Sequence, residues 1–100
     1  MERPNAWLTY SDADMQDLET VAKKYRHFLN VGKTERECIT QIVKEAEEAG
    51  YVSLEEKVKN GEDLKAGDKV YQVGMQKIIA LYHIGEEDLA QGMNILCAHI

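Results

Sequence analysis

The chain has 100 residues, which is enough for one domain at most. With 44% hydrophobic and 30% charged residues its composition is typical of a globular protein, and no apolar run reaches the ~20 residues of a membrane helix. A net charge of −6, without a concentrated basic stripe, argues against nucleic-acid binding. Two cysteines are too few for a disulfide framework, and no secretory signal pattern opens the chain, so we expect a cytoplasmic protein.

The first predicted element is a helix that begins near Ser11. Ser11 and Asp14 form a capping-box pattern, and acidic residues in the opening turns followed by basic residues in the later turns complement the helix dipole. Gly32 is a natural end for this helix. Its apolar residues recur with a period of 3.6: Met15, Leu18, Val21, Ala22, Tyr25, Phe28 and Leu29.

A second helix is predicted between a second capping box and Gly50. The box is formed by Thr34 and Glu37. The apolar face that follows consists of Cys38, Ile39, Ile42, Val43, Ala46 and Ala49. Because the connection between the two helices is short, we expect them to lie antiparallel.

After Gly50 the pattern changes from helical to strand-like. Val70, Tyr71 and Val73 lie in one β-prone run, and residues 78–84 form a second, so the two predict a hairpin around Gly74. Residues 93–100 are nearly all apolar, as expected of a strand covered on both faces. The predicted fold class is α/β, more narrowly an α+β fragment of two antiparallel helices, a hairpin and a buried strand.

The last predicted strand reaches Ile100 without a turn residue or polar cluster. A free carboxylate beside buried surface would carry a desolvation cost, so we expect the natural polypeptide to continue past Ile100. Such a fragment would keep an unpaired strand edge. We therefore expect it to self-associate, as a dimer or by strand exchange.

Histidines and cysteines are the residues with metal-binding or nucleophilic potential. His27 is interpreted as solvated and His83 as a hydrogen-bonded structural residue. Cys97 is interpreted as a small core residue, with a nucleophilic thiol paired with His99 as the lesser alternative. His99 falls at the carboxyl end of the last predicted strand, where α/β sheets hold their sites, and a structural and a functional role both stay open.

Several stretches, spread over nearly the whole chain and in register, resemble the aspartyl-aminopeptidase family of two-zinc metallo-aminopeptidases, which includes the vacuolar aminopeptidase I type. Cys97 departs from the family pattern, which commonly has Gly there, and Gly74-Met75-Gln76 replaces a more usual basic-Gly turn. The matching stretches are Asn5-Ala6-Trp7, Gly32-Lys33-Thr34-Glu35-Arg36-Glu37, Glu47-Glu48-Ala49-Gly50-Tyr51, Leu64-Lys65-Ala66-Gly67-Asp68-Lys69-Val70-Tyr71, Lys77-Ile78-Ile79-Ala80 and Gly92-Met93-Asn94-Ile95, which leads into Ala98-His99-Ile100.

The resemblance implies that residues 1–100 are the amino-terminal part of a catalytic peptidase domain, the start of a zinc-peptidase α/β sandwich. His99 matches the first zinc ligand, in a His-x-Asp motif whose Asp would be position 101. The longer protein would bind two zinc ions, remove amino-terminal residues from peptides with a preference for acidic ones, and assemble as a dodecamer. The fragment would contain no catalytic residue, bind no zinc tightly and be inactive.

Two alternatives to a peptidase fragment remain at this point. One is a complete, non-enzymatic α+β interaction module, in which His99 is incidental. The other is a truncated thiol enzyme that uses Cys97. An Asp encoded immediately after Ile100 favours the peptidase, whereas a stop codon favours the module.

Overall fold

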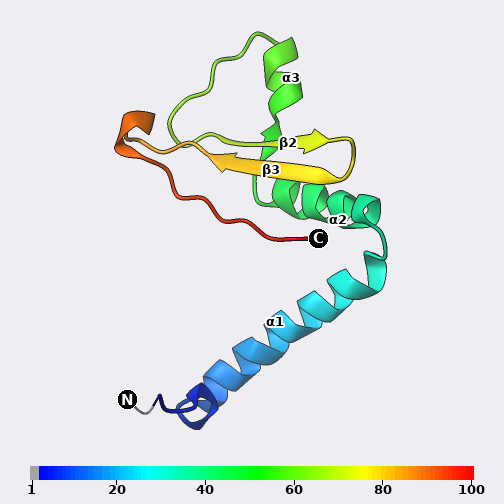
Figure 1. Ribbon diagram of the computed structural model, residues 1–100, viewed down its shortest axis with the longest axis vertical. Helices are drawn as coiled ribbons and strands as arrows, with labels where there is room; N and C mark the ends of the chain where they lie inside the picture. The colour runs from blue at the N-terminus through cyan, green and yellow to red at the C-terminus, as the bar shows by residue number, and fades with distance from the viewer. Residues whose placement is uncertain (1–2) are drawn as a thin grey trace. The chain divides into compact units, whose positions relative to one another are not determined.

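The computed structural model describes residues 3–100 and divides the chain into two compact units, Met1–Val31 and Gly32–Ile100. The first unit contains a short 3-10 helix, Ala6–Leu8, and the long helix α1, Asp12–Val31 (Figure 1). The predicted cap of α1 is confirmed: the Ser11 amide donates to Asp14 Oδ2 at 2.8 Å, and the Asp14 amide donates to Ser11 Oγ at 3.2 Å. None of the residues of α1 is buried.

The second unit begins with helix α2, Glu35–Glu48, whose predicted capping box is also confirmed. The Glu37 amide donates to Thr34 Oγ1, and a Glu37 carboxylate oxygen accepts from the Thr34 amide at 2.9 Å. Gly50 follows the helix with a φ of +88°, a conformation that glycine adopts without strain. Both predicted helices therefore exist, and their antiparallel arrangement stays a prediction.

A three-stranded sheet follows, in the order β1-β2-β3 (Figure 1). Strand β1, Val52–Ser53, runs parallel to β2, Lys69–Gly74, and β2 pairs antiparallel with β3, Ile78–His83. The predicted hairpin is thus confirmed. Helix α3, Leu54–Lys59, connects β1 to the loop that precedes β2. Neither β1 nor α3 was predicted.

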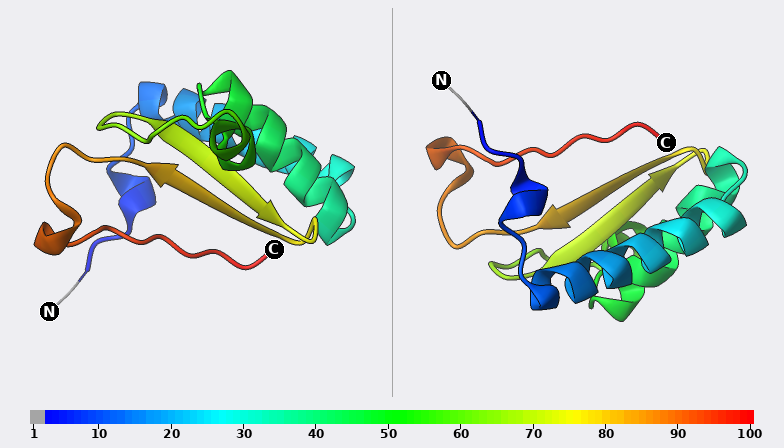
Figure 2. Two further views of the ribbon diagram at one scale, coloured as in Figure 1. Left: turned by 90° about the horizontal axis from the view of Figure 1, so that it is seen from above. Right: turned by 90° about the horizontal axis from the view of Figure 1, so that it is seen from below.

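The core of the second unit lies where α2 packs against β2 and β3 (Figure 2). Val70 is 1% exposed and Ile39 is 3% exposed, and Cys38 and Ala46 complete the set of buried hydrophobic residues among residues 3–100. The face of α2 that the sequence predicted therefore supplies three of these four side chains. Helices together with a mixed sheet confirm the predicted α+β class.

The predicted strand at residues 93–100 is wrong. This segment has no helix or strand, and its residues are exposed, with Leu96 at 98% and Ile95 at 75%. An all-apolar strand needs a sheet neighbour and a cover on each face. Within residues 3–100 no strand pairs with this segment, so the strand edge on which self-association was predicted is not formed. The predicted core position of Cys97 is wrong for the same reason, since this thiol is exposed.

Candidate functional site

The structure does not bring the histidines and cysteines together. His27 lies exposed on α1, as predicted. His83 is exposed at the end of β3, and its side chain makes no hydrogen bond to the described part of the chain, so its predicted structural role is wrong. Cys97 and His99 lie in the exposed segment 93–100. Among residues 3–100, no three His, Cys, Asp or Glu side chains are grouped so that they could hold a metal ion.

His99 therefore stands alone as a candidate ligand. A structural zinc site takes four protein ligands and a catalytic zinc site takes three. Residues 3–100 supply one predicted ligand, the exposed imidazole of His99. The residues described here do not fit a zinc ion by themselves. If His99 is a ligand, the other ligands come from outside residues 3–100.

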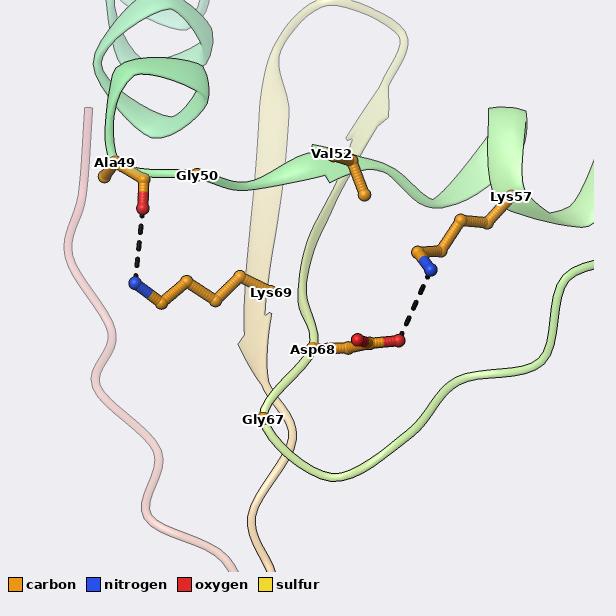
Figure 3. A pocket seen from close by; sticks show the side chains of 7 residues that line it. All are labelled: Ala49, Gly50, Val52, Lys57, Gly67, Asp68 and Lys69. Carbon is orange, nitrogen blue, oxygen red and sulfur yellow. Dashed lines mark hydrogen bonds and ion pairs between the residues drawn. The ribbon is translucent and has the colours of Figure 1, made fainter.

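A hollow of the second unit lies elsewhere, beside the start of β2 (Figure 3). It is open to solvent and has a volume of about 400 Å³. Its walls come from the end of α2, from β1, from α3 and from the turn that precedes β2. The lining residues are Ala49, Gly50, Val52, Lys57, Gly67, Asp68 and Lys69.

Lys57 on α3 provides one of the two cationic groups of this hollow. Its Nζ lies 3.3 Å from Asp68 Oδ2 and 3.3 Å from Glu62 Oε2, and its side chain is only 18% exposed. The hydrogen bond to Asp68, followed by that to Glu62, raises the pKa of Lys57. Asp68 also accepts from the Lys65 amide at 3.1 Å, and this bond, ahead of the one from Lys57, lowers the pKa of Asp68. Both groups are charged at neutral pH and hold α3 against the loop before β2.

Lys69 on β2 provides the second cationic group. Its Nζ donates to the Ala49 carbonyl at 3.2 Å, just beyond the end of α2 (Figure 3). The same Nζ lies 5.7 Å from the centre of the Tyr51 ring. A cation there also complements the negative end of the helix dipole. Nearby, the Tyr71 hydroxyl donates to Glu47 Oε1 at 2.8 Å, which raises the pKa of Tyr71.

The lysines of the hollow are thus both engaged in joining α2, α3 and β2. The lining contains no histidine, cysteine, serine or threonine that could act as a nucleophile or as a soft metal ligand. We therefore interpret the hollow as a structural feature, a joint in which the contacts of Lys57 and Lys69 hold α2, α3 and β2 together. Sequence reasoning missed it because α3, which carries Lys57, was not predicted; the signal was the acidic start and basic end of Leu54–Lys59.

Comparison with known proteins relates the chain to peptidases. No family model matches it. A probable M18 family aminopeptidase 1 from Clostridium acetobutylicum is 40% identical over 99 residues, which is 99% of this chain and 21% of that protein. A protein of the same name from Thermotoga maritima is 34% identical over 104 residues, which covers 100% of this chain and 20% of that protein.

A solved structure shows the same relationship in three dimensions. The crystal structure of aminopeptidase I from Borrelia burgdorferi matches with a TM-score of 0.80 and 27% sequence identity, over 90% of this chain and 21% of that one. The chain spans about a fifth of the length of the curated relatives it matches. The predicted resemblance is therefore confirmed: nearly every residue of this chain has a counterpart in proteins named M18 family aminopeptidase.

Proposed function

We propose that this chain is the amino-terminal part of the catalytic domain of a cytoplasmic metallo-aminopeptidase, which removes the amino-terminal residue of peptides and prefers acidic residues. The observation that carries the proposal is the similarity over 99% of the chain to proteins named aminopeptidase, supported by the fold match at a TM-score of 0.80. The dodecameric assembly of the longer protein and the peptide as its substrate belong to the same proposal.

Within this proposal the chain contributes a scaffold and one metal ligand. The capped helix α2 and the sheet form the packed part, whereas His99 lies on the exposed segment 93–100, where its imidazole is accessible to groups from elsewhere. The zinc pair that the family resemblance implies would supply an activated water for hydrolysis. Catalytic groups lie outside the 100 residues, and His99 acts by helping to hold the metal.

The role of His99 is tested in the longer protein. We expect His99→Ala to lower the zinc content and to remove most of the aminopeptidase activity, because an imidazole ligand is lost from the metal site. Metal analysis and hydrolysis of an aminoacyl-nitroanilide measure the two quantities. His83→Ala is the matched control, since this exposed imidazole on β3 has no role in the proposal. Full zinc content and activity in His99→Ala would contradict the assignment.

Experiments on the isolated chain test the proposal that the catalytic groups and the other metal ligands lie outside these 100 residues. We expect it to bind zinc weakly in equilibrium dialysis and to leave aminopeptidase substrates intact, because one imidazole cannot complete a coordination shell. Cleavage by the purified chain that a chelator abolishes would contradict this. The reading frame beyond Ile100 separates the peptidase from the small interaction module: an Asp codon supports the former and a stop codon the latter.

A further inference from the structure

Asn60 and Gly61 follow helix α3 and are the only Asn-Gly pair in the sequence. An asparagine before glycine is especially prone to deamidation, because glycine has no side chain to hinder the attack of its backbone nitrogen on the asparagine side chain. The other asparagines precede Ala6, Val31 and Ile95, and β-branched valine and isoleucine hinder such an attack. The sequence therefore favours this reaction at one position.

The reaction consumes water and releases ammonia. The Gly61 nitrogen gives its proton to solvent and bonds to Asn60 Cγ, while the bond between Cγ and Nδ2 breaks and Nδ2 leaves as ammonia with a proton from solvent. Water then adds to either carbonyl carbon of the resulting cyclic imide, the bond from that carbon to the ring nitrogen breaks, and the nitrogen takes up a proton. Opening at Cγ leaves an aspartate with an ordinary backbone, and opening at the main-chain carbonyl leaves an isoaspartate.

The structure holds the attacking nitrogen in a hydrogen bond. Helix α3 ends in the paired bonds of a Schellman motif, in which the Gly61 amide donates to the Val58 carbonyl at 3.1 Å and the Glu62 amide donates to the Lys57 carbonyl at 3.0 Å. Gly61 has the left-handed conformation that this motif requires, with a φ of +68°. Its nitrogen must leave this bond before it can lose its proton and attack Asn60.

The Asn60 side chain is held by the same segment of chain. Its Nδ2 donates to Glu62 Oε1 at 3.3 Å, and Glu62 Oε2 lies 3.3 Å from Lys57 Nζ. Lys57 also pairs with Asp68 at 3.3 Å in the joint beside β2. All these contacts lie within the second unit, so the joint determines how readily the end of α3 opens.

We propose that Asn60 is a deamidation site which the folded end of α3 protects, and that its modification weakens the joint beside β2. Deamidation replaces the Nδ2 donor by a carboxylate next to Glu62, so an attraction becomes a repulsion. The new negative charge also lies at the carboxyl end of α3, where the helix dipole disfavours it. An isoaspartate adds a carbon to the main chain as well, which disrupts the Schellman hydrogen bonds.

This modification is independent of the proposed peptidase function. It needs only water and the adjoining backbone, so it requires neither a partner nor an uncovered surface. Because the modified end of α3 opens more readily, we expect the change to mark aged molecules by a loosened joint.

Incubation of the 100-residue chain at mildly alkaline pH, both folded and in guanidinium chloride, tests the protection. Peptide mapping by mass spectrometry follows each asparagine and separates aspartate from isoaspartate. We expect Asn60 to be the fastest asparagine to react in the denatured chain, and to react at least about tenfold more slowly in the folded chain. Asn60→Gln is the control without reaction, because the longer side chain disfavours ring closure.

A pair of lysine variants tests the link to the joint. Lys57→Met removes the cation that holds Glu62 and Asp68, and we expect it to raise the rate at Asn60 in the folded chain at least about threefold. Lys59→Met is the matched control, since Lys59 pairs with Glu55 on the exposed side of α3. The rates of both variants in guanidinium chloride should equal that of the unchanged chain.

Asn60→Asp reproduces the charge of the product and tests the consequence even where Lys57→Met fails to fold. We expect its urea midpoint to fall below that of Asn94→Asp, which makes the same change of charge in the segment 93–100. The proposal is overturned by equal rates at Asn60 in the folded and denatured chain, by a rate at Asn60 in the folded chain no higher than at Asn30, by equal rates in the two folded lysine variants, or by equal midpoints of the two aspartate variants.

Discussion

Helices α1 and α2 have the same sequence pattern but differ in how many of their residues are buried. Each opens with a capping box and carries an apolar face at the helical period. Yet α2 buries Cys38, Ile39 and Ala46 within 14 residues, whereas α1 buries none of its 20. The difference is the sheet that α2 packs against. Periodicity identifies which face of a helix is apolar, and the tertiary structure decides whether the chain itself covers that face.

Truncation of one apolar residue in each helix gives the sharpest test of this difference. We expect Ile39→Ala in α2 to lower the free energy of unfolding by about 3 kcal/mol, because it leaves a cavity at a site that is 3% exposed. Val21→Ala in α1, at a site that is 67% exposed, should change it by no more than about 0.5 kcal/mol. Urea unfolding at low protein concentration measures both. Equal losses would show that the apolar face of α1 is buried within the monomer.

Removal of the helix caps should also affect the stability of the two helices differently. Thr34→Ala leaves the first turn of α2 without its side-chain acceptor, and we expect a loss of about 1 kcal/mol in the free energy of unfolding. Ser11→Ala should instead speed amide exchange in the first turn of α1 and leave the urea midpoint of the second unit unchanged. Thr34→Ser keeps the acceptor oxygen and serves as control. A midpoint that drops equally for Ser11→Ala would mean that the two units unfold together.

In the turn between β2 and β3 we expect a substitution that raises the free energy of unfolding instead of lowering it. Met75 and Gln76 have φ values of 49° and 56°, in a region that glycine occupies without strain. We expect Gln76→Gly to raise the free energy of unfolding by about 0.5–1 kcal/mol. The same replacement at Gln72, exposed within β2, should lower it by a similar amount because glycine weakens a strand interior. A loss of stability at both positions would contradict the strained turn.

The pH dependence of stability should show the contribution of the joint beside β2, which contains the ion pair between Lys57 and Asp68. Hydrogen bonds lower the pKa of Asp68 from its ordinary value of 3.8, so its contribution is present above that value and is lost as the pH falls through the lower, folded-state pKa. The pKa of Lys57 is raised from 10.5, so its contribution is present below that value and is lost at higher pH. Asp68→Asn should therefore flatten both limbs of a plot of urea midpoint against pH. An unchanged profile would mean that the joint adds nothing to stability.

The features that the sequence determined are those that a few neighbouring residues decide. Ser11 with Asp14, and Thr34 with Glu37, satisfy amides within one turn, and this fixed the starts of both helices. The hairpin was predictable because its two β-prone runs are separated only by a short turn. Likewise, the similarity to aminopeptidases could be recognised from short sequence stretches distributed along the chain.

Features that depend on partners distant in the sequence were decided by the tertiary structure. Strand β1 has two residues and exists only through its pairing with β2, so no local pattern could reveal it. Residues 93–100 have the composition of a buried strand but no neighbour within the described chain to pair with, and they remain exposed. His99 meets the same limit, because an imidazole becomes a metal ligand only when several groups converge, and convergence is a property of the fold.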